Sequence, residues 1–337
     1  MKYVTMGHGS GGRLTEEIIG MAREAFPSAY LASGLDSALL PSRAGSLAFT
    51  TDSFVVRPLF FPGGDIGRLA VCGTVNDLCV VGAEPRFLSC SLILEEGLPL
   101  EELRRILASM GEAALEAGVE IVTGDTKVVE KGHGDGLYIN TAGIGFVPAG
   151  SEIDGSGIEV GDALIVSGSL GDHAMTIMSL REGLGFESGL KSDCAPLYGL
   201  VRALKDSGAR PRFIRDLSRG GLAESLHELA LLAGLSLEIV EESLVVKPEV
   251  LALSEILGID PLSMANEGKL LAVVRRGDED RALAAMRGHP YGRDAALVGR
   301  VVGATPEAGS ARVRMRTATG GIRVLGRPSG EKLPRIC

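Results

Sequence analysis

The sequence predicts an α+β protein made of two α/β-type blocks, and three features lead to this prediction. Segments with strand-like and helix-like patterns alternate along the chain. The stretch Pro148-Ala-Gly-Ser-Glu-Ile-Asp-Gly-Ser-Gly157 is rich in turn residues and separates these segments into two groups. The length of 337 residues suits about two domains. We therefore predict a first domain over residues 36–150 and a second over residues 160–326.

The first block contains the clearest helix of the chain. Pro99 opens its first turn, Gly118 ends it, and between them apolar residues recur at spacings of three and four. These apolar residues are Leu100, Leu103, Leu107, Met110 and Ala114. The other elements predicted for this block are strands at 46–51, 86–94, 119–123 and 137–146 and a glycine-flanked helix at 65–82.

The second block is predicted to open with the strand Ala163–Ser167. Helices are expected at 172–183, 196–207, 222–233 and 249–257, and further strands at 236–240, 269–275, 296–302 and 311–316. Both flanks have a different character. Residues 1–35 are expected to form a flexible, glycine-rich segment, and residues 327–337 a flexible tail that ends in Cys337.

Composition narrows the function classes. The net charge is −9 and the basic residues are scattered, so we expect no nucleic-acid partner. The longest charge-free run, Gly136–Ser151, is too short and too interrupted to span a bilayer, and no signal peptide is evident, so no membrane association is expected. The five cysteines form no CxxC pair. Reduced thiols in a cytoplasmic protein are the simplest interpretation.

Phosphate handling would have to rely on carboxylates, because the sequence lacks both GxxxxGK[ST] and a GxGxxG that opens a helix. Carboxylates that hold Mg²⁺ are the alternative device. Four acidic positions suit it: Asp36, Asp52, Asp77 with the preceding Asn76, and Asp125. Asp52 directly follows one predicted strand and Asp125 comes after another, and strand ends are where sites gather in α/β proteins.

Each of these positions also has a plainer interpretation. Aspartate is common in turns and at helix caps, so Asp36 or Asp52 alone does not decide between a ligand and a turn residue. Asp77 is different, because it interrupts the apolar helix Leu69–Val81 and its carboxylate must face a partner or a cleft. Lys127 shares a face with Asp125 if the segment is extended, and could neutralise a transferred phosphate or simply lie on the surface.

Three further segments contain candidate residues. His8-Gly-Ser-Gly-Gly12 can wrap an anion with its backbone amides, or can be a disordered terminus. Asp216-Leu-Ser-Arg-Gly-Gly221 precedes a predicted helix, so the amides near Gly220 and Gly221 could receive a phosphate, although such a turn is also common. Glu267, just before a strand, is a candidate base or metal ligand, and its plain interpretation is a loop carboxylate.

Cys337 is the sharpest feature of the sequence. It ends the segment Leu333-Pro-Arg-Ile-Cys337, where no following residue can pack over it. Ten extended residues reach roughly 35 Å, enough to carry the thiol between two active sites. An incidental terminal cysteine is the alternative.

Together these motifs resemble one family, the hydrogenase maturation factor HypE, over nearly the whole chain. That family lies within the ATP-binding superfamily of aminoimidazole ribonucleotide synthetase, selenophosphate synthetase and thiamine-monophosphate kinase. The matching segments are His8–Gly12, Thr51–Val55, Pro58–Gly64, Asn76-Asp77, Thr123–Val129, Ala265–Leu270 and Leu333–Cys337. The aspartate pattern is superfamily-wide, whereas the cysteine-terminated tail is specific to HypE. Ser218 stands where threonine is expected and keeps the hydroxyl.

The resemblance implies the aminoimidazole ribonucleotide synthetase-like fold and a homodimer in which the N-terminal sheets pair into a barrel. It also implies that a HypF-like carbamoyltransferase loads Cys337, that ATP with Mg²⁺ then dehydrates the carboxamide to a thiocyanate, and that a HypC–HypD-like iron-carrying complex receives the cyanide for nickel–iron hydrogenase. Asp36, Asp52, Asp77 and Asp125 are assigned to Mg²⁺. Asn76, Asp216, Gly220 and Gly221 are assigned to ATP binding together with these aspartates. Catalytic roles are assigned to Cys337, Lys127 and Glu267.

Two rival functions stay open at this point. A related enzyme is the first. Selenophosphate synthetase needs a reactive residue near its N-terminus, and residues 1–71 contain no Cys, whereas a small-molecule kinase would not need the tail. A non-catalytic scaffold that docks maturation factors is the second. ATP turnover on the carbamoylated chain separates it from an enzyme.

Overall fold

The computed structural model describes residues 2–9, 13–32, 37–38, 40–183, 189–303, 313–327 and 336–337. The chain divides into two compact units. Unit 1 comprises residues 1–79, 83–151 and 335–337, and unit 2 comprises residues 80–82 and 152–334. The main change from one unit to the other, after Ser151, lies within the turn-rich stretch 148–157.

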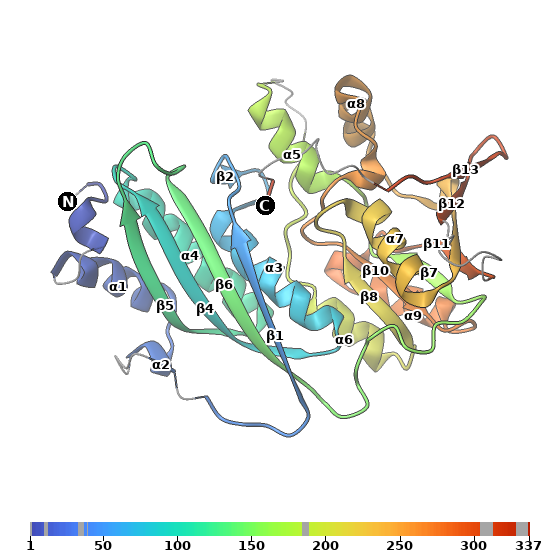
Figure 1. Ribbon diagram of the computed structural model, residues 1–337, viewed down its shortest axis with the longest axis horizontal. Helices are drawn as coiled ribbons and strands as arrows, with labels where there is room; N and C mark the ends of the chain where they lie inside the picture. The colour runs from blue at the N-terminus through green and yellow to red at the C-terminus, as the bar shows by residue number, and fades with distance from the viewer. Residues whose placement is uncertain are drawn as a thin grey trace. The chain divides into compact units, whose positions relative to one another are not determined.

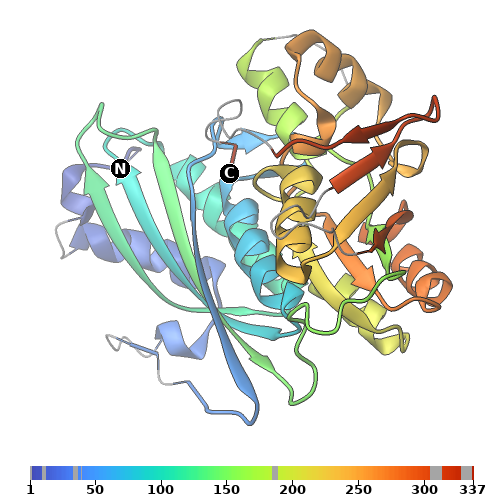
Figure 2. The ribbon, with the colours of Figure 1, turned by 45° about the vertical axis from the view of Figure 1, so that its right-hand side comes forward.

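Unit 1 is built on one sheet. Its strands are β1 (Ser46–Phe54), β4 (Glu84–Glu95), β5 (Glu120–Val129) and β6 (Leu137–Val147), and its helices are α1 (Arg13–Ala25), α2 (Ala29–Ala32), α3 (Ile66–Val80) and α4 (Leu100–Ala117). The short strands β2 (Phe60–Phe61) and β3 (Gly64–Asp65) form a hairpin. The strand order is β1-β6-β4-β5, and only β4 and β5 run parallel. Helices α3 and α4 cover one face of this sheet (Figures 1 and 2).

The helix predicted between Pro99 and Gly118 is confirmed as α4. Its buried side chains repeat at the predicted spacing and include Leu103, Leu107 and Met110. Gly118 ends the helix in the left-handed region at φ +72°, which glycine adopts without strain.

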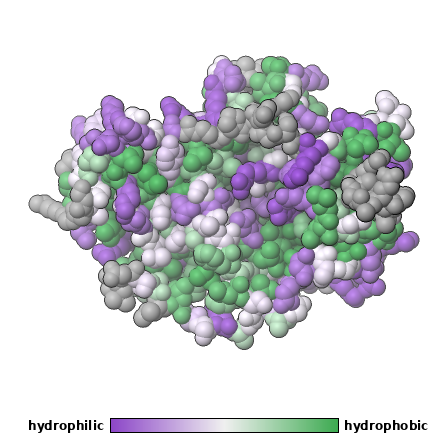
Figure 3. Space-filling model, in the orientation of Figure 1, coloured by the Kyte–Doolittle hydropathy of each residue, from purple (hydrophilic) through white to green (hydrophobic). Residues whose placement is uncertain are grey.

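The other face of the sheet is largely open. The exposed residues of β1 alternate, so Leu47 and Phe49 point away from the helices and are 62% and 66% exposed. Ile93 of β4 is also exposed. Among the described residues, α2 covers part of this face near β5, with the ring of Tyr30 edge-on to Phe87. Figure 3 shows the apolar side chains on the surface of this sheet.

The structure corrects the two strand ends on which the sequence analysis placed carboxylates. Asp52 lies inside β1 rather than after it, because β1 pairs with β6 as far as Phe54. Asp125 likewise lies inside β5, which pairs with β4 up to Val129. Each predicted strand is too short because backbone pairing continues through polar residues, which hydropathy patterning does not register.

The structure also differs from the sequence analysis before residue 36. Residues 13–25 form the helix α1, and its side chains Ile18 and Met21 are buried. The end of α1 packs closely on α4, since a Cβ placed on Gly111 would lie 2.2 Å from the carbonyl oxygen of Ala25. The glycines around this segment obscured its amphipathic pattern.

Unit 2 is built on a seven-stranded sheet of order β13-β12-β9-β11-β7-β10-β8. Its strands are β7 (Ala163–Val166), β8 (Pro211–Asp216), β9 (Ser236–Val240), β10 (Leu270–Val274), β11 (Ala296–Val302), β12 (Val313–Arg316) and β13 (Ile322–Val324). Its helices are α5 (Asp172–Arg181), α6 (Tyr198–Asp206), α7 (Gly221–Ala233), α8 (Pro248–Leu257) and α9 (Glu279–Arg287).

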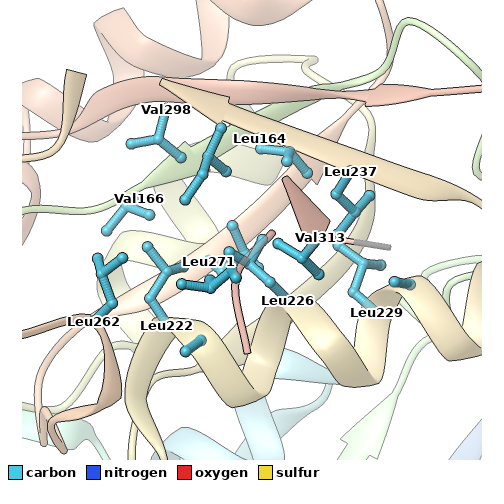
Figure 4. Close-up of a cluster of buried hydrophobic side chains, with 14 of the residues drawn as sticks. Leu164, Val166, Leu222, Leu226, Leu229, Leu237, Leu262, Leu271, Val298 and Val313 are labelled. Atoms are coloured by element: carbon cyan, nitrogen blue, oxygen red, sulfur yellow. The ribbon is translucent and has the colours of Figure 1, made fainter. Parts of the chain in front are cut away.

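Helix α7 packs its apolar side on one face of this sheet. Leu222, Leu226 and Leu229 meet alternating strand residues such as Leu164 and Leu237 in a buried core (Figure 4). Helices α6 and α9 cover the opposite face (Figure 1). The elements β8, β13 and α9 were not predicted. The α+β, two-block fold class is confirmed. In the described part of the chain, no helix is long and apolar enough to cross a membrane.

Candidate active site

Two of the predicted carboxylates line one seam between β1 and α3. Thr50 Oγ1 donates a 2.9 Å hydrogen bond to Asp77 Oδ2, so the polar residue within this apolar helix faces β1. Asp52 points to the same helix, because its Oδ2 would lie 3.7 Å from a Cβ placed on Gly73. Thr50 and Asp52 are two residues apart on a strand, and Gly73 and Asp77 are one turn apart on a helix. Both carboxylates are half-buried and share this seam.

A buried pair of hydroxyls fixes α3 against the sheet beside this seam. Thr141, which stands opposite Asp52 on β6, donates from Oγ1 to the carbonyl oxygen of Ala70 at 3.1 Å. Its Oγ1 lies 2.5 Å from Thr74 Oγ1, and because the Thr141 proton is already used, Thr74 is the donor in this second bond. Asn76 lies on the same helix and is buried. These bonds hold α3 against β6 beside the seam.

Asp125 and Lys127 form a second polar group on β5. They point to the same side of the strand, and Lys127 Nζ lies 2.7 Å from each carboxylate oxygen of Asp125. The hydrogen bond from Lys127 lowers the pKa of the Asp125 carboxyl below its ordinary value. Both side chains are well exposed, so this pair is available to a phosphate.

The two polar groups lie at opposite edges of the sheet. β6 and β4 separate β1 from β5, so at a usual strand spacing the edges are roughly 14 Å apart. The register places Asp125 in line with Ser53, so it points to the open face, whereas Asp52 points to the helices. Ligand distances to Mg²⁺ are only about 2.1 Å, so Asp125 and Asp52 of the same copy of the chain do not share a metal ion.

The last residues of the chain contact unit 1 next to β1. The backbone N–H of Val55 donates a 3.2 Å hydrogen bond to the carbonyl oxygen of Cys337. The side chain of Ile336 is buried, and Cys337 is half-buried. Residues 327–337 were predicted to form a flexible tail, whereas the structure holds Ile336 and Cys337 against unit 1. The contact places Cys337 beside Val55, directly after the end of the strand that carries Asp52.

In unit 2, the turn after β8 and the loop before β10 are neighbours. Gly220 and Gly221 precede and begin α7 with φ of +73° and +57°. A Cβ on Gly221 would lie 2.3 Å from the carbonyl oxygen of Met264, so only glycine allows this approach. Asp216 stands opposite Leu270 in the sheet. The structure thus brings the predicted phosphate-binding turn close to the loop of Glu267.

The loop 264–269 holds Glu267 in a buried position, 5% exposed. Asn266 fixes one side of this loop, since its Oδ1 accepts from the N–H of Gly171 and its own N–H donates to the Leu217 carbonyl oxygen. Asp193 fixes the other side, since its carboxylate accepts from the N–H groups of Glu267 and Gly268. Neither role could be predicted from the sequence, because the partners of both residues are far away along the chain.

Asp36 and the glycine-rich motif at 8–12 complete the predicted site residues. Asp36 lies outside the described residues, as do Ser10, Gly11 and Gly12 of the glycine-rich motif. His8 is buried in a short 3₁₀ turn, with Nδ1 3.0 Å from Thr5 Oγ1. Within the described ranges, no group of three or more His, Cys, Asp or Glu side chains is arranged to hold a metal ion.

Comparison with known families matches both blocks. Residues 34–147 match the family model of the AIR synthase related protein N-terminal domain, and residues 159–310 match that of its C-terminal domain. A solved thiamine monophosphate kinase from Aquifex aeolicus, 22% identical with a TM-score of 0.59, shares the fold.

Curated relatives and solved structures are similar over nearly the entire chain. Carbamoyl dehydratase HypE of Cupriavidus necator is 49% identical over 99% of this chain and 95% of its own length. The Escherichia coli protein of that name is 47% identical over 100% of both, and its crystal structure matches with a TM-score of 0.91 over 96% of this chain and 100% of that one. A HypE structure in complex with ATP is 45% identical, with a TM-score of 0.93 over 98% of this chain and 99% of that one. The chain belongs to the HypE family of AIR synthase related proteins.

Proposed function

We propose that this protein is an ATP-dependent carbamoyl dehydratase that converts a carboxamide on its own Cys337 into a thiocyanate, for the cyanide ligands of nickel–iron hydrogenase. The observation that supports it most is the similarity to carbamoyl dehydratases, which extends over 100% of this chain for the Escherichia coli relative. Cys337 therefore lies within the aligned region. The solved small-molecule kinase is 22% identical to this chain, and identity that low supports a shared fold and not a shared reaction.

The reaction removes one water from a thiocarbamate in two steps. The carboxamide oxygen attacks the γ-phosphorus of ATP, ADP leaves, and the amide nitrogen loses its first proton. The C–O bond then breaks with phosphate as the leaving group while a base takes the second proton from nitrogen, which gives S–C≡N. Phosphorylation is needed because an amide oxygen is otherwise a poor leaving group.

The residues of the site suit these steps. Asp52 and Asp77 offer half-buried carboxylate oxygens on one seam, the donor type that Mg²⁺ prefers, so they fit a magnesium ion. When bound, this ion offsets negative charge on the phosphates of ATP. Lys127 stabilises the phosphoryl group during transfer, with Asp125 beside it. Glu267 takes the proton from the amide nitrogen.

Mass spectrometry of the C-terminal peptide tests this function. Incubation with a HypF-like carbamoyltransferase, its carbamoyl donor and ATP is expected to add one carboxamide to Cys337 and then to remove a mass equal to one water. The second change should not occur when EDTA is added after loading, because the proposed ATP site needs the metal. A loaded peptide that keeps its water, on a loaded chain that turns over no ATP, would contradict the proposal and favour a scaffold.

We also propose that two copies of the chain associate through unit 1. The open face of its sheet carries exposed Leu47, Phe49 and Ile93, which soluble proteins usually cover. Pairing two such sheets into a barrel would bury these residues. It would also bring β5 of one copy toward the β1–α3 seam of its partner, so each ATP site would use Asp52 and Asp77 of one copy with Asp125 and Lys127 of the other.

Mixing two inactive variants tests this shared site. Asp77→Asn and Asp125→Asn should each lower dehydration by roughly 10²-fold, as for loss of a positioned charge. Mixed dimers contain one site with both substitutions and one with neither. A mixture in equal amounts, after exchange of subunits, is therefore expected to recover about a quarter of the unsubstituted rate. Single-turnover formation of thiocyanate measures it. Recovery no greater than the mean of the two variants would show that each site lies within one copy.

The partners follow from the same proposal. A structure of a relative, 46% identical with a TM-score of 0.79 over 94% of this chain and 100% of that one, is a HypE–HypF complex, which supports a HypF-like carbamoyltransferase as the donor. A HypC–HypD-like iron-carrying complex is the proposed acceptor of cyanide. None of the five cysteines forms a disulfide, which suits the reducing cytoplasm.

A further inference from the structure

Asp193 lies outside every motif of the sequence but contacts the loop of Glu267 directly. Its side chain is 2% exposed. Oδ1 accepts a 3.1 Å hydrogen bond from the backbone N–H of Glu267, and Oδ2 accepts one of 3.2 Å from the N–H of Gly268. Lys269 Nζ lies 3.2 Å from the same Oδ2. One buried carboxylate therefore holds three consecutive residues.

The two segments also hold each other through the backbone. The N–H of Ala195 donates a 3.3 Å hydrogen bond to the carbonyl oxygen of Glu267. A Cβ on Gly268 would lie 1.9 Å from the carbonyl oxygen of Asp193, so this contact requires glycine. Because the N–H and C=O of Glu267 are both bound to the 193–195 segment, the direction of its side chain depends on that segment.

Asp193 acts in its ionised form. Burial alone would raise the pKa of its carboxyl, but Lys269, His173 and the N–H of Glu267 together outweigh burial, and the pKa lies below its ordinary value. A charged acceptor makes stronger hydrogen bonds to backbone N–H groups than a neutral one. The loop is thus held by charge-assisted bonds.

We infer that Asp193 is the positioning residue for Glu267, and that it fixes the backbone from which this base reaches the amide nitrogen of the loaded tail. The inference depends on the proposed function, in which Glu267 is the base. Misplacement of a reacting group by about 1 Å can lower a rate 10²-fold. Loss of Asp193 is therefore expected to affect the dehydration step and not the steps before it.

The test compares Asp193→Asn with a matched control. Asp162 is also a buried carboxylate of unit 2, and it too accepts from two backbone N–H groups, those of Glu159 and Arg276, and from one cation, Arg212. It lies at the other end of β7, away from the loop of Glu267. Asp193→Asn is expected to lower single-turnover dehydration about 10²-fold, with ATP affinity and carbamoyl loading within about twofold. Asp162→Asn should keep the dehydration rate despite a lower melting temperature.

A double variant shows whether Asp193 acts through Glu267. Asp193→Asn should cause little further loss on a Glu267→Gln background, since residues that act as a unit are not additive. An unchanged rate for Asp193→Asn, or a loss that multiplies with that of Glu267→Gln, would overturn the inference and leave the proposed function intact. A full rate for Glu267→Gln would instead remove the base itself, and the inference with it. If Asp193→Asn does not fold, Lys269→Met removes the cation that contacts the Asp193 carboxylate. The same rate comparisons, alone and on the Glu267→Gln background, then test the inference.

Discussion

Replacing Cys337 with alanine is expected to abolish carbamoyl acceptance and thiocyanate formation completely, while ATP binding and the melting temperature stay nearly unchanged. The substitution removes only the thiol. Two contacts at this end of the chain, the buried Ile336 side chain and the hydrogen bond from the Val55 N–H to the Cys337 carbonyl oxygen, do not depend on sulfur and are kept. Because the acceptor is attached to the enzyme, no small molecule should replace it.

The other four cysteines provide the control for this experiment. Cys72, Cys79, Cys90 and Cys194 are all buried. Burial raises the pKa of the Cys90 thiol to about 12, so almost no thiolate is present near neutral pH to act as a nucleophile. Cys194→Ala should accept the carbamoyl group as the unsubstituted chain does. Peptide mapping that finds the label on any of the four in the Cys337→Ala protein would disprove the assignment of the carrier.

Glu267→Gln and Lys127→Ala are expected to lower dehydration by roughly 10²-fold or more, and carbamoyl loading should be normal in both. Gln has nearly the shape of Glu and keeps the backbone bonds to Asp193, so the fold should be retained. Lys127 is exposed and its ammonium contacts Asp125, so its removal costs the fold little. Rapid-quench measurement of thiocyanate formation, on a tail that already carries the carbamoyl group, separates dehydration from loading.

Matched variants separate this effect from a general loss of charge. Lys131→Ala removes another exposed lysine a few residues away, and Glu279→Gln removes another carboxylate of unit 2 that pairs with Arg300. Both should keep the full dehydration rate. If Glu267→Gln retains that rate, the proton is taken by another group. If Lys127→Ala retains it, the transferred phosphoryl is stabilised elsewhere.

The parts of the fold that could be predicted from sequence are those set by local pattern. The spacing of Leu103, Leu107 and Met110 predicted α4 correctly, because a helix repeats its buried side every three or four residues. Asp77 was predicted to face a partner for an equally local reason, and Thr50 is that partner. The turn at Gly220 and Gly221 was likewise predicted from a local pattern, two glycines directly before a helix.

The arrangement of the site depended on pairings between distant segments and could not be predicted. Strand order decides that Asp125 and Asp52 lie at opposite edges of one sheet, and no local pattern encodes strand order. The same holds for Asp193, whose partner Lys269 is 76 positions away. Its neighbours in the sequence, Ser192 and Cys194, form no motif that would single out Asp193. The strand ends at Asp52 and Asp125 were wrong because hydrogen bonding continues beyond the apolar run.

In the proposed pairing of two copies, the separation of the two polar groups across the sheet would link nucleotide affinity to protein concentration. If ATP contacts Asp77 of one copy and Lys127 of another, each bound nucleotide also holds the two copies together. Thermodynamic linkage then requires that ATP tighten association by the same free energy by which association tightens ATP binding. Dilution would weaken both, so the apparent ATP affinity becomes a property of the pair of chains rather than of one chain.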